Sequence, residues 1–83
     1  MKFKANINIM PLETLLDPQG KAVSANMKNV GLNEVSNVRI GKHITLTIEA
    51  TSKKEASEKV DEACRKILSN QIMESYDFDL EKL

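Results

Sequence analysis

The chain has little of the chemistry from which enzyme and metal sites are built. Its 83 residues include one cysteine, one histidine, one tyrosine, two phenylalanines and no tryptophan. A single cysteine excludes an internal disulfide and is typical of a reducing compartment. A structural zinc site needs about four cysteine or histidine ligands, which one copy of this chain does not have. We therefore expect no catalytic, cofactor-binding or metal-binding residues.

Charge of one sign is not in excess either. Lysine and arginine number 12, aspartate and glutamate number 12, and the formal net charge is zero. Because nucleic-acid binding depends on a surplus of basic side chains, we expect no nucleic-acid partner. The sequence also lacks a long hydrophobic run and the pattern of a signal peptide. We expect a cytoplasmic protein without a membrane partner.

What the sequence does contain is enough apolar material for a small folded domain. Hydrophobic residues make up 41% of the chain, and the length allows one domain, residues 1–83. In so small a core, the free energy gained by burying apolar side chains barely exceeds the free-energy cost of the conformational entropy lost on folding. We therefore expect the protein to associate with other copies or other chains.

The first quarter of the chain predicts a strand followed by a helix. Apolar and polar residues alternate over residues 3–9, the period of a half-buried strand. Asp17 is suited to cap a helix whose first residue is Pro18. Gly31 is suited to end that helix in the left-handed conformation.

The middle of the chain predicts a hairpin. Residues 37–40 and 44–48 each alternate between apolar and polar side chains. A two-residue loop would turn the second set of apolar side chains to the wrong face. We therefore expect an odd loop, Gly41-Lys42-His43.

The last third predicts a second helix and a final strand. Ser52-Lys53-Lys54-Glu55 is a capping box, so the helix begins at Lys53, and we expect it to end near Asn70. Its apolar stripe consists of Ala56, Val60, Ala63, Cys64 and Ile67. Residues 76–80 alternate again as a strand.

This order of elements predicts an α+β fold. The arrangement is a ferredoxin-like βαββαβ sandwich, a four-stranded antiparallel sheet with two helices on one face. The other face of the sheet is polar, and it is either solvated or covered by another subunit. Cys64 is expected in the core and His43 at a solvated tip, so neither is favoured as a catalytic group.

Two segments stand apart from this scaffold, one around Asp17 and one around Arg39. Gly20 lies in the first turn of the first helix, where it costs up to about 1 kcal/mol relative to alanine. Either a partner's backbone approaches it closely, or it is a tolerated glycine near a frayed end. Leu15 and Leu16 before it are either core residues or include an exposed anchor. The expected partner or oligomer contacts are Asp17, Gln19, Gly20, Lys21, Arg39, Gly41 and Lys42.

The chain resembles the PurS family at these same segments. The resemblance is carried by Leu16-Asp17-Pro18-Gln19-Gly20-Lys21-Ala22-Val23 and by Val38-Arg39-Ile40-Gly41-Lys42. It continues through Gly31-Leu32-Asn33-Glu34-Val35, Lys66-Ile67-Leu68-Ser69-Asn70 and the strand with Tyr76. It covers nearly the whole chain, and the family fold agrees with the fold predicted above.

The resemblance implies a role in purine synthesis. PurS is the small, non-catalytic subunit of phosphoribosylformylglycinamidine synthase, which converts formylglycinamide ribonucleotide to the amidine with ATP and glutamine. Its implied partners are other copies in a dimer or tetramer, a PurL-type synthetase subunit and a PurQ-type glutaminase subunit. ATP and magnesium are then expected in the large synthetase subunit, and the small subunit brings the others together and assists ammonia transfer.

Two other functions remain open at this point. ACT-like regulatory domains share the topology, and such a domain would bind an amino acid at a dimer interface near residues 10–21. A small standalone enzyme would need a catalytic group that the sequence does not display. A binding assay with amino acids separates the first of these from a subunit of a complex.

Overall fold

The computed structural model describes residues 1–12 and 17–83 and contains three strands and two helices. In chain order these are β1 (Lys2–Pro11), α1 (Pro18–Asn29), β2 (Lys42–Glu49), α2 (Lys53–Ala63), a π-helical turn η1 (Cys64–Leu68) and β3 (Glu74–Lys82). The expectation for Leu15 and Leu16 lies outside the described residues. The predicted starts of both helices are confirmed at Pro18 and Lys53.

The three strands form one antiparallel sheet in the order β2-β1-β3. In the register, Ile7 of β1 faces Ile44 of β2 on one side and Phe78 of β3 on the other. Alternate β1 side chains are fully buried beneath α2, as period-two patterning requires. This core cluster consists of Ala5, Ile7, Ile9, Val60 and Cys64. The burial of Cys64 confirms its predicted place in the core.

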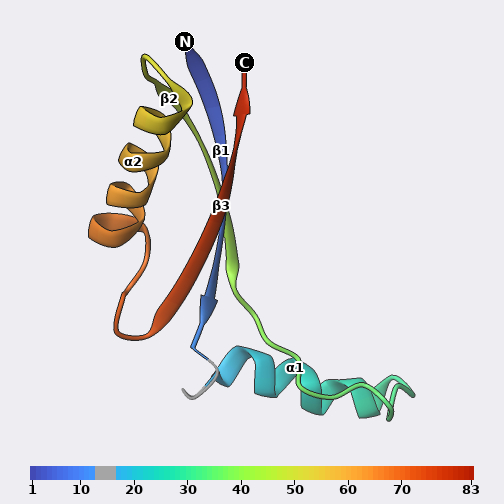
Figure 1. Cartoon of the computed structure of the whole chain (residues 1–83). Helices are drawn as coiled ribbons and strands as arrows, with labels where there is room; N and C mark the ends of the chain where they lie inside the picture. Colours follow the sequence, from blue (N-terminus) through green and yellow to red (C-terminus); the bar gives the residue numbers. More distant parts are fainter. Residues whose placement is uncertain (13–16) are drawn as a thin grey trace.

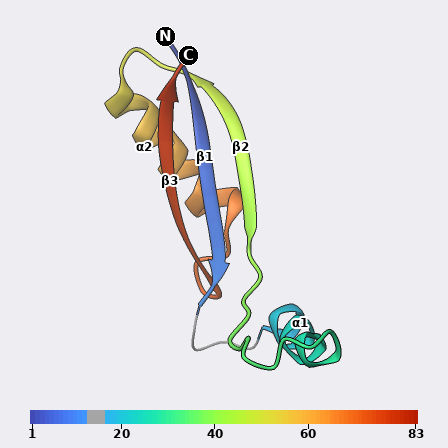
Figure 2. The ribbon, with the colours of Figure 1, turned by 90° about the vertical axis from the view of Figure 1, so that its right-hand side faces the viewer.

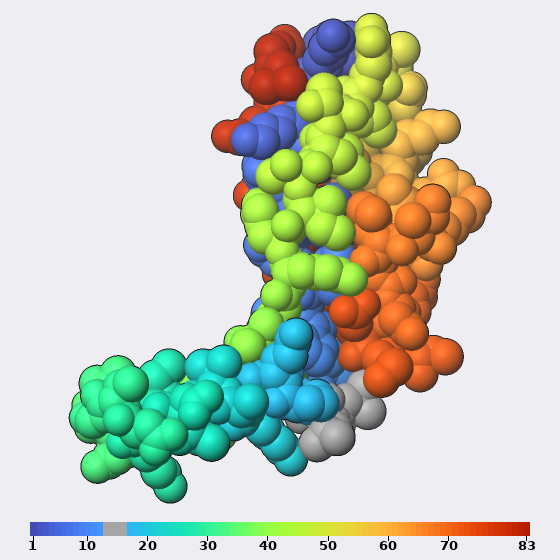
Figure 3. Space-filling model, turned by 180° about the vertical axis from the view of Figure 1, so that it is seen from behind, coloured from blue at the N-terminus to red at the C-terminus, as the bar shows by residue number. Residues whose placement is uncertain are grey.

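The molecule consists of a body and an arm. The body is the sheet with α2 and η1 on one face, and the arm is residues 17–41, made of α1 and the segment that returns from it (Figure 1). Figures 2 and 3 show the arm projecting beyond the end of the sheet, so α1 does not lie on the sheet face. The radius of gyration is 16.4 Å, whereas a compact domain of this length has about 12 Å.

The predicted four-stranded sheet with both helices on one face is therefore wrong for the described residues. Only α2 covers the sheet, and residues 37–40 form no strand. Asn37 has a φ of 56°, which interrupts an extended backbone. The Ile40 N–H donates to the Asp17 side chain, which caps α1, instead of joining a sheet ladder. The α+β class, the antiparallel pairing and the two helices are as predicted.

The predicted hairpin with the loop Gly41-Lys42-His43 is also wrong. Lys42 and His43 already belong to β2, opposite Ile9 and Asn8. His43 is exposed as predicted, but it lies in a strand and not at a tip, with its Nδ1 2.7 Å from the Asn8 side-chain oxygen. The chain enters β2 from the arm and not from a paired strand. The length of a hairpin loop therefore does not determine which face the β2 side chains take.

The second helix keeps its predicted stripe only as far as Cys64. The Ser52 side chain accepts from the Glu55 N–H at 3.1 Å, as the capping box predicts. After Ala63 the chain continues as η1, with the Ser69 N–H bonded five residues back to the Cys64 carbonyl. This extra residue in the turn rotates Ile67 out of the stripe, and its side chain is 81% exposed.

The end of α1 follows the sequence closely. Gly31 takes a φ of 82°, the left-handed conformation predicted for it. The Leu32 N–H donates to the Met27 carbonyl at 2.9 Å and the Gly31 N–H to Lys28 at 3.3 Å, which closes the last turn. Val30 and Leu32 remain 69% and 41% exposed beyond it.

Neither helix in residues 1–12 and 17–83 has the length and apolar content needed to cross a bilayer.

Candidate functional site

The candidate site is the junction where the arm joins the body, and Asp17 organises it. One carboxylate oxygen accepts the Gly20 N–H at 3.0 Å, and the other accepts the Ile40 N–H at 3.1 Å. The first bond caps α1, and the second joins the helix to the returning segment. The two backbone donors, with the nearby Arg39 guanidinium, hold the pKa of the Asp17 carboxyl below its usual value.

Gly20 is required by a close approach within the same chain. A Cβ built on it would lie 2.3 Å from the Val38 carbonyl oxygen and 2.4 Å from an Asp17 carboxylate oxygen. Both distances are far below van der Waals contact. The sequence left two reasons open for this glycine, a partner's backbone or a tolerated residue at a frayed end, and the structure shows a third, the close approach of the chain's own Val38 carbonyl.

The basic residues of the junction differ in their surroundings. Arg39 is half-buried, and its guanidinium donates to the Pro11 carbonyl at the end of β1. Lys42 is exposed, with its ammonium 3.8 Å from a Glu74 carboxylate oxygen at the start of β3. Lys21 points into solvent from the first turns of α1. Of the three, Arg39 therefore connects the arm to the end of β1, whereas Lys42 links β2 to the start of β3.

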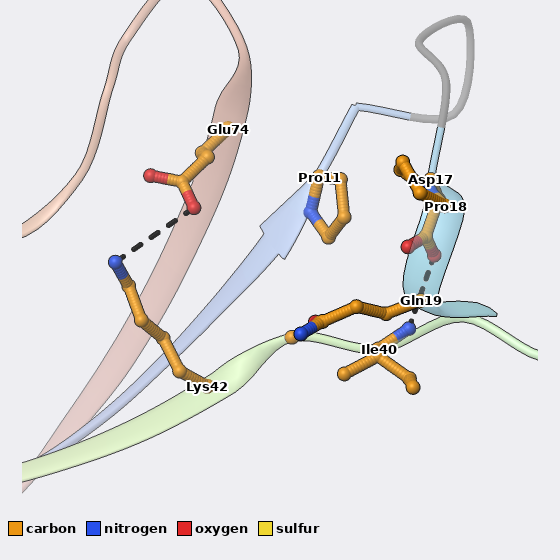
Figure 4. Close-up of a pocket in the computed structure, with 8 residues that line it drawn as sticks. Pro11, Asp17, Pro18, Gln19, Ile40, Lys42 and Glu74 are labelled. Carbon is orange, nitrogen blue, oxygen red and sulfur yellow. Dashed lines mark hydrogen bonds and ion pairs between the residues drawn. The ribbon is translucent and has the colours of Figure 1, made fainter.

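A shallow pocket of about 290 Å³ lies between these groups (Figure 4). Gln19 and Lys42 reach across it from α1 and β2, and Glu74 lies on its far side. Its lining consists of Pro11, Asp17, Pro18, Gln19, Ile40, Gly41, Lys42 and Glu74. The amino-acid sensor alternative placed its ligand near residues 10–21, and residues 13–16 of this stretch lie outside the described residues.

Gly41 completes the junction in the same way as Gly20. A Cβ on Gly41 would lie 2.2 Å from the Ile9 carbonyl oxygen. Only hydrogen therefore fits at Gly20, where α1 meets the returning segment, and at Gly41, where the arm re-enters the body. The junction brings together Asp17, Gln19, Gly20, Arg39, Gly41 and Lys42, whereas Lys21 lies apart on the solvent side of α1.

Sequence reasoning missed a second polar cluster, where α2 meets β3. The Tyr76 hydroxyl donates to Asp61 at 2.5 Å, and the Arg65 guanidinium donates to the other Asp61 oxygen at 2.9 Å. The Tyr76 bond, with Arg65, lowers the pKa of Asp61, and the same bond raises the pKa of Tyr76. Burial raises the pKa of the neighbouring Cys64 thiol. A thiol held neutral and buried is a core group and not an activated nucleophile.

The open face of the sheet carries a third polar network. The Asn6 amide donates to Asp79 at 2.8 Å and to Glu81 at 3.1 Å, and the Asn8 amide donates to Asp77 at 3.1 Å. The alternation of polar residues predicted this face, but the cross-strand bonds depend on the register. In the part of the chain that the structure describes, no three acidic, histidine or cysteine residues are grouped to hold a metal.

The polar contacts and the exposed arm indicate the general class of this protein. The polar groups of the described residues tie strands, helix and arm to one another, and apolar side chains at the arm's end stay exposed. A rigid body with a projecting arm is the architecture of a small α+β subunit that works in contact with other chains.

Comparison with known proteins identifies the family. Residues 4–82 match the PurS family model, described as phosphoribosylformylglycinamidine (FGAM) synthase. The chain is 41% identical to the PurS subunit of this synthase from a Synechocystis species, over 98% of this chain and 81% of the relative. It is 38% identical to that of Bacillus subtilis, over 98% and 95%. The chain belongs to the PurS family.

Solved structures agree with this assignment. The Bacillus subtilis PurS structure superposes with a TM-score of 0.86 at 39% identity, covering 96% of this chain and 99% of that one. A chain in the structure of PurLQS from Thermotoga maritima gives a TM-score of 0.89 at 30% identity, covering 98% and 99%. The projecting arm is therefore part of a fold that these relatives share.

Proposed function

We propose that this chain is the non-catalytic subunit of the FGAM synthase complex of purine biosynthesis. In this role it binds other copies of itself, a PurL-type synthetase subunit and a PurQ-type glutaminase subunit. It holds the two larger subunits in register, so that ammonia released from glutamine reaches the synthetase. The membership in the PurS family over residues 4–82 supports this role, as does the PurLQS assembly named for a relative.

The single structural observation that carries the proposal is the uncovered arm. The chain has a solvent-accessible surface of 5940 Å², whereas a compact monomer of its mass exposes about 5,000 Å². A stable interface buries about 800 Å² on each partner. The excess surface of this elongated chain is of the same size, so association with another copy would compensate for it.

The junction residues supply the contact surface in this proposal. In this proposal a partner chain docks beside the pocket at the base of the arm. The residues that lie at or beside this base are Asp17, Gln19, Gly20, Lys21, Arg39, Gly41 and Lys42. Rigid backbone held by Asp17 limits the entropy lost on docking. ATP and magnesium, in this proposal, bind in the synthetase subunit, and the complex acts in the cytoplasm.

A reconstitution assay tests the function. The synthetase and glutaminase subunits from the same organism are mixed with and without this chain, and amidine formation is measured from glutamine and from free ammonia. We expect glutamine-dependent activity only with this chain, while ammonia-dependent activity of the synthetase persists without it. If the chain changes neither activity, the proposed role is wrong.

The basic contact residues are tested by a triple substitution, Lys21→Ala, Arg39→Ala and Lys42→Ala. We expect the variant to keep its fold and to lose glutamine-dependent activity in the same assay, because assembly weakens. Circular dichroism checks folding, and sedimentation velocity measures assembly. Lys54→Ala, at an exposed position in the first turn of α2 and away from the junction, is the control. A triple variant that assembles normally contradicts the contact assignment.

A further inference from the structure

The outer edge of β3 is a second surface that the junction does not explain. In the sheet order β2-β1-β3, this strand has a neighbour on one side only (Figure 2). The Leu83 N–H donates to the Lys2 carbonyl at 2.9 Å, and the Leu12 N–H donates to Met73 at 2.9 Å. Antiparallel pairing alternates every second residue, so odd-numbered β3 residues bond to β1. The backbone N–H and C=O groups of Tyr76, Phe78 and Leu80 therefore face outward.

This free edge carries a column of carboxylates on the open sheet face. Asp77, Asp79 and Glu81 lie two residues apart, which spaces them by about 7 Å along the strand. One oxygen of each carboxylate accepts a hydrogen bond from the Asn6 or Asn8 amide. The second oxygen of each carboxylate has no bond to a described side chain. Lys4 lies opposite Glu81 in the register, so the acidic excess is centred on Asp77 and Asp79.

The opposite side of the same edge is apolar. Tyr76, Phe78 and Leu80 turn their side chains toward the face that α2 covers, and all three remain only half-buried. A strand added at this edge would therefore meet acidic groups with one set of alternate side chains and apolar groups with the other. The complementary sequence alternates basic and apolar residues.

We propose that the β3 edge accepts an extended strand from a different subunit, with lysine or arginine at alternate positions. Backbone bonds to Tyr76, Phe78 and Leu80 would give affinity, and the basic side chains facing Asp77 and Asp79 would give register. This inference rests on the proposed function, because it needs the chain to assemble with other proteins. It adds to that function the edge used and the chemistry of the segment bound.

Charge favours a different chain over a second copy at this edge. Two copies joined through β3 about a two-fold axis would bring each carboxylate column against its own image, and like charges directly opposite destabilise a strand pair. The edge of β2 carries His43, Thr45, Thr47 and Glu49 on the same face and has no such column. The acidic column thus disfavours self-pairing through β3 and attracts a basic strand.

Amide hydrogen exchange in the reconstituted complex tests the inference. The probe is the purified synthetase and glutaminase subunits added to isotope-labelled chain. We expect exchange at the Tyr76, Phe78 and Leu80 amides to slow by at least about tenfold on assembly, because a paired edge amide is protected. The edge amides of β2, at Thr45 and Thr47, serve as the internal comparison and are not expected to slow with them on addition of the partners.

Matched charge reversals separate the edge from general electrostatics. Asp79→Lys and Glu49→Lys make the same charge change on the same face, one on each edge strand. We expect Asp79→Lys to weaken binding of the partner subunits by about tenfold at low salt, and Glu49→Lys to leave it unchanged within about twofold. Thermal melts check that both variants fold.

Three outcomes overturn the inference. Assembly without slowed exchange at Tyr76, Phe78 and Leu80 shows that the edge stays open. Slow exchange at these amides in the chain alone shows that a second copy occupies the edge. Equal weakening of partner binding by Asp79→Lys and Glu49→Lys shows that the overall charge of the sheet face, and not the β3 edge, affects binding. In each case the complex still assembles from the wild-type chain, so the proposed function survives, whereas failure of the wild-type chain to assemble rejects that function itself.

Discussion

At the residue scale, the base of the arm depends on one carboxylate and two missing side chains. Asp17 satisfies a helix N–H and a backbone N–H more than twenty residues away, at 3.0 and 3.1 Å. Gly20 and Gly41 leave room for the Val38 and Ile9 carbonyls. Asp17 and the two glycines, which the sequence singled out, therefore hold the arm in its position. Their role in contacts with partners is a separate proposal.

Replacing Gly20 with alanine tests this packing. In an open helix position the change would stabilise by up to about 1 kcal/mol. Here the added methyl group meets the Val38 carbonyl, and we expect destabilisation of about 1–3 kcal/mol. Urea denaturation measures the free energy of unfolding, with Gln19→Ala, at the exposed position beside the buried Gly20, as the control. A Gly20→Ala variant as stable as the wild type contradicts the close approach.

Acidification tests the Asp17 bonds. The pKa of Asp17 is lowered in the folded chain, so its ionised form contributes stability above the unfolded value of about 3.9. That contribution is lost as the pH falls through the lowered folded value. We expect the Gly20 and Ile40 amide resonances to stay constant from neutral pH down to that region and to move only below about pH 4.

Asp17→Asn supplies the control for this titration, since its side chain does not ionise. In the variant, the Ile40 amide should lose the acid transition seen in the wild type. A wild-type transition well above pH 4 would mean that the carboxylate is not stabilised by these two donors.

At the scale of elements, the end of α2 decides which apolar residues are available for contacts. A regular helix through residue 67 would bury Ile67 with Val60 and Cys64. The turn η1 inserts one residue and leaves Ile67 81% exposed, whereas Val60 and Cys64 are fully buried. The same stripe of sequence thus divides into a core part and a surface part.

A pair of alanine substitutions checks this division. We expect Val60→Ala to destabilise the chain by about 2–3 kcal/mol, because it removes buried methyl groups and leaves a cavity. We expect Ile67→Ala to change stability by less than about 0.5 kcal/mol. Thermal or urea unfolding measures both. Similar losses in the two variants would show that Ile67 packs in the core.

At the scale of the whole molecule, the arm makes the chain long and thin. Its principal extents are 51 × 27 × 14 Å, and α1 has no sheet of its own chain beneath it. Val30 and Leu32 lie exposed at the far end of the arm. A helix of this length in this position gains stability mainly by packing against another surface.

Charged substitutions at the end of the arm test its role in self-association. We expect the wild type to sediment as a dimer or larger oligomer at micromolar concentration. Val30→Asp combined with Leu32→Asp should shift it toward the monomer, because burying a carboxylate without a partner is unfavourable. Lys28→Asp on the same helix controls for added negative charge. A wild type that is monomeric throughout, or a variant that still associates, contradicts the assignment.

Features that depend on local pattern could be predicted from the sequence. The strand over residues 3–9, the helix starts at Pro18 and Lys53, the left-handed Gly31 and the buried Cys64 all follow from period, capping and burial, which neighbours in the chain define. The sequence also singled out the two segments around Asp17 and Arg39, but their meeting at one junction was not predicted.

Where these elements pack depends on contacts between distant parts of the chain. Residues 37–40 have the alternation of a strand, yet Asp17 and Gly20 bind them to α1, and no local pattern encodes that choice. The Asp61–Tyr76 bond and the carboxylate column of β3 likewise depend on register between distant segments. Periodicity specifies which face of an element is apolar, whereas the surface that covers this face depends on long-range contacts, and for the arm we propose that another chain provides it.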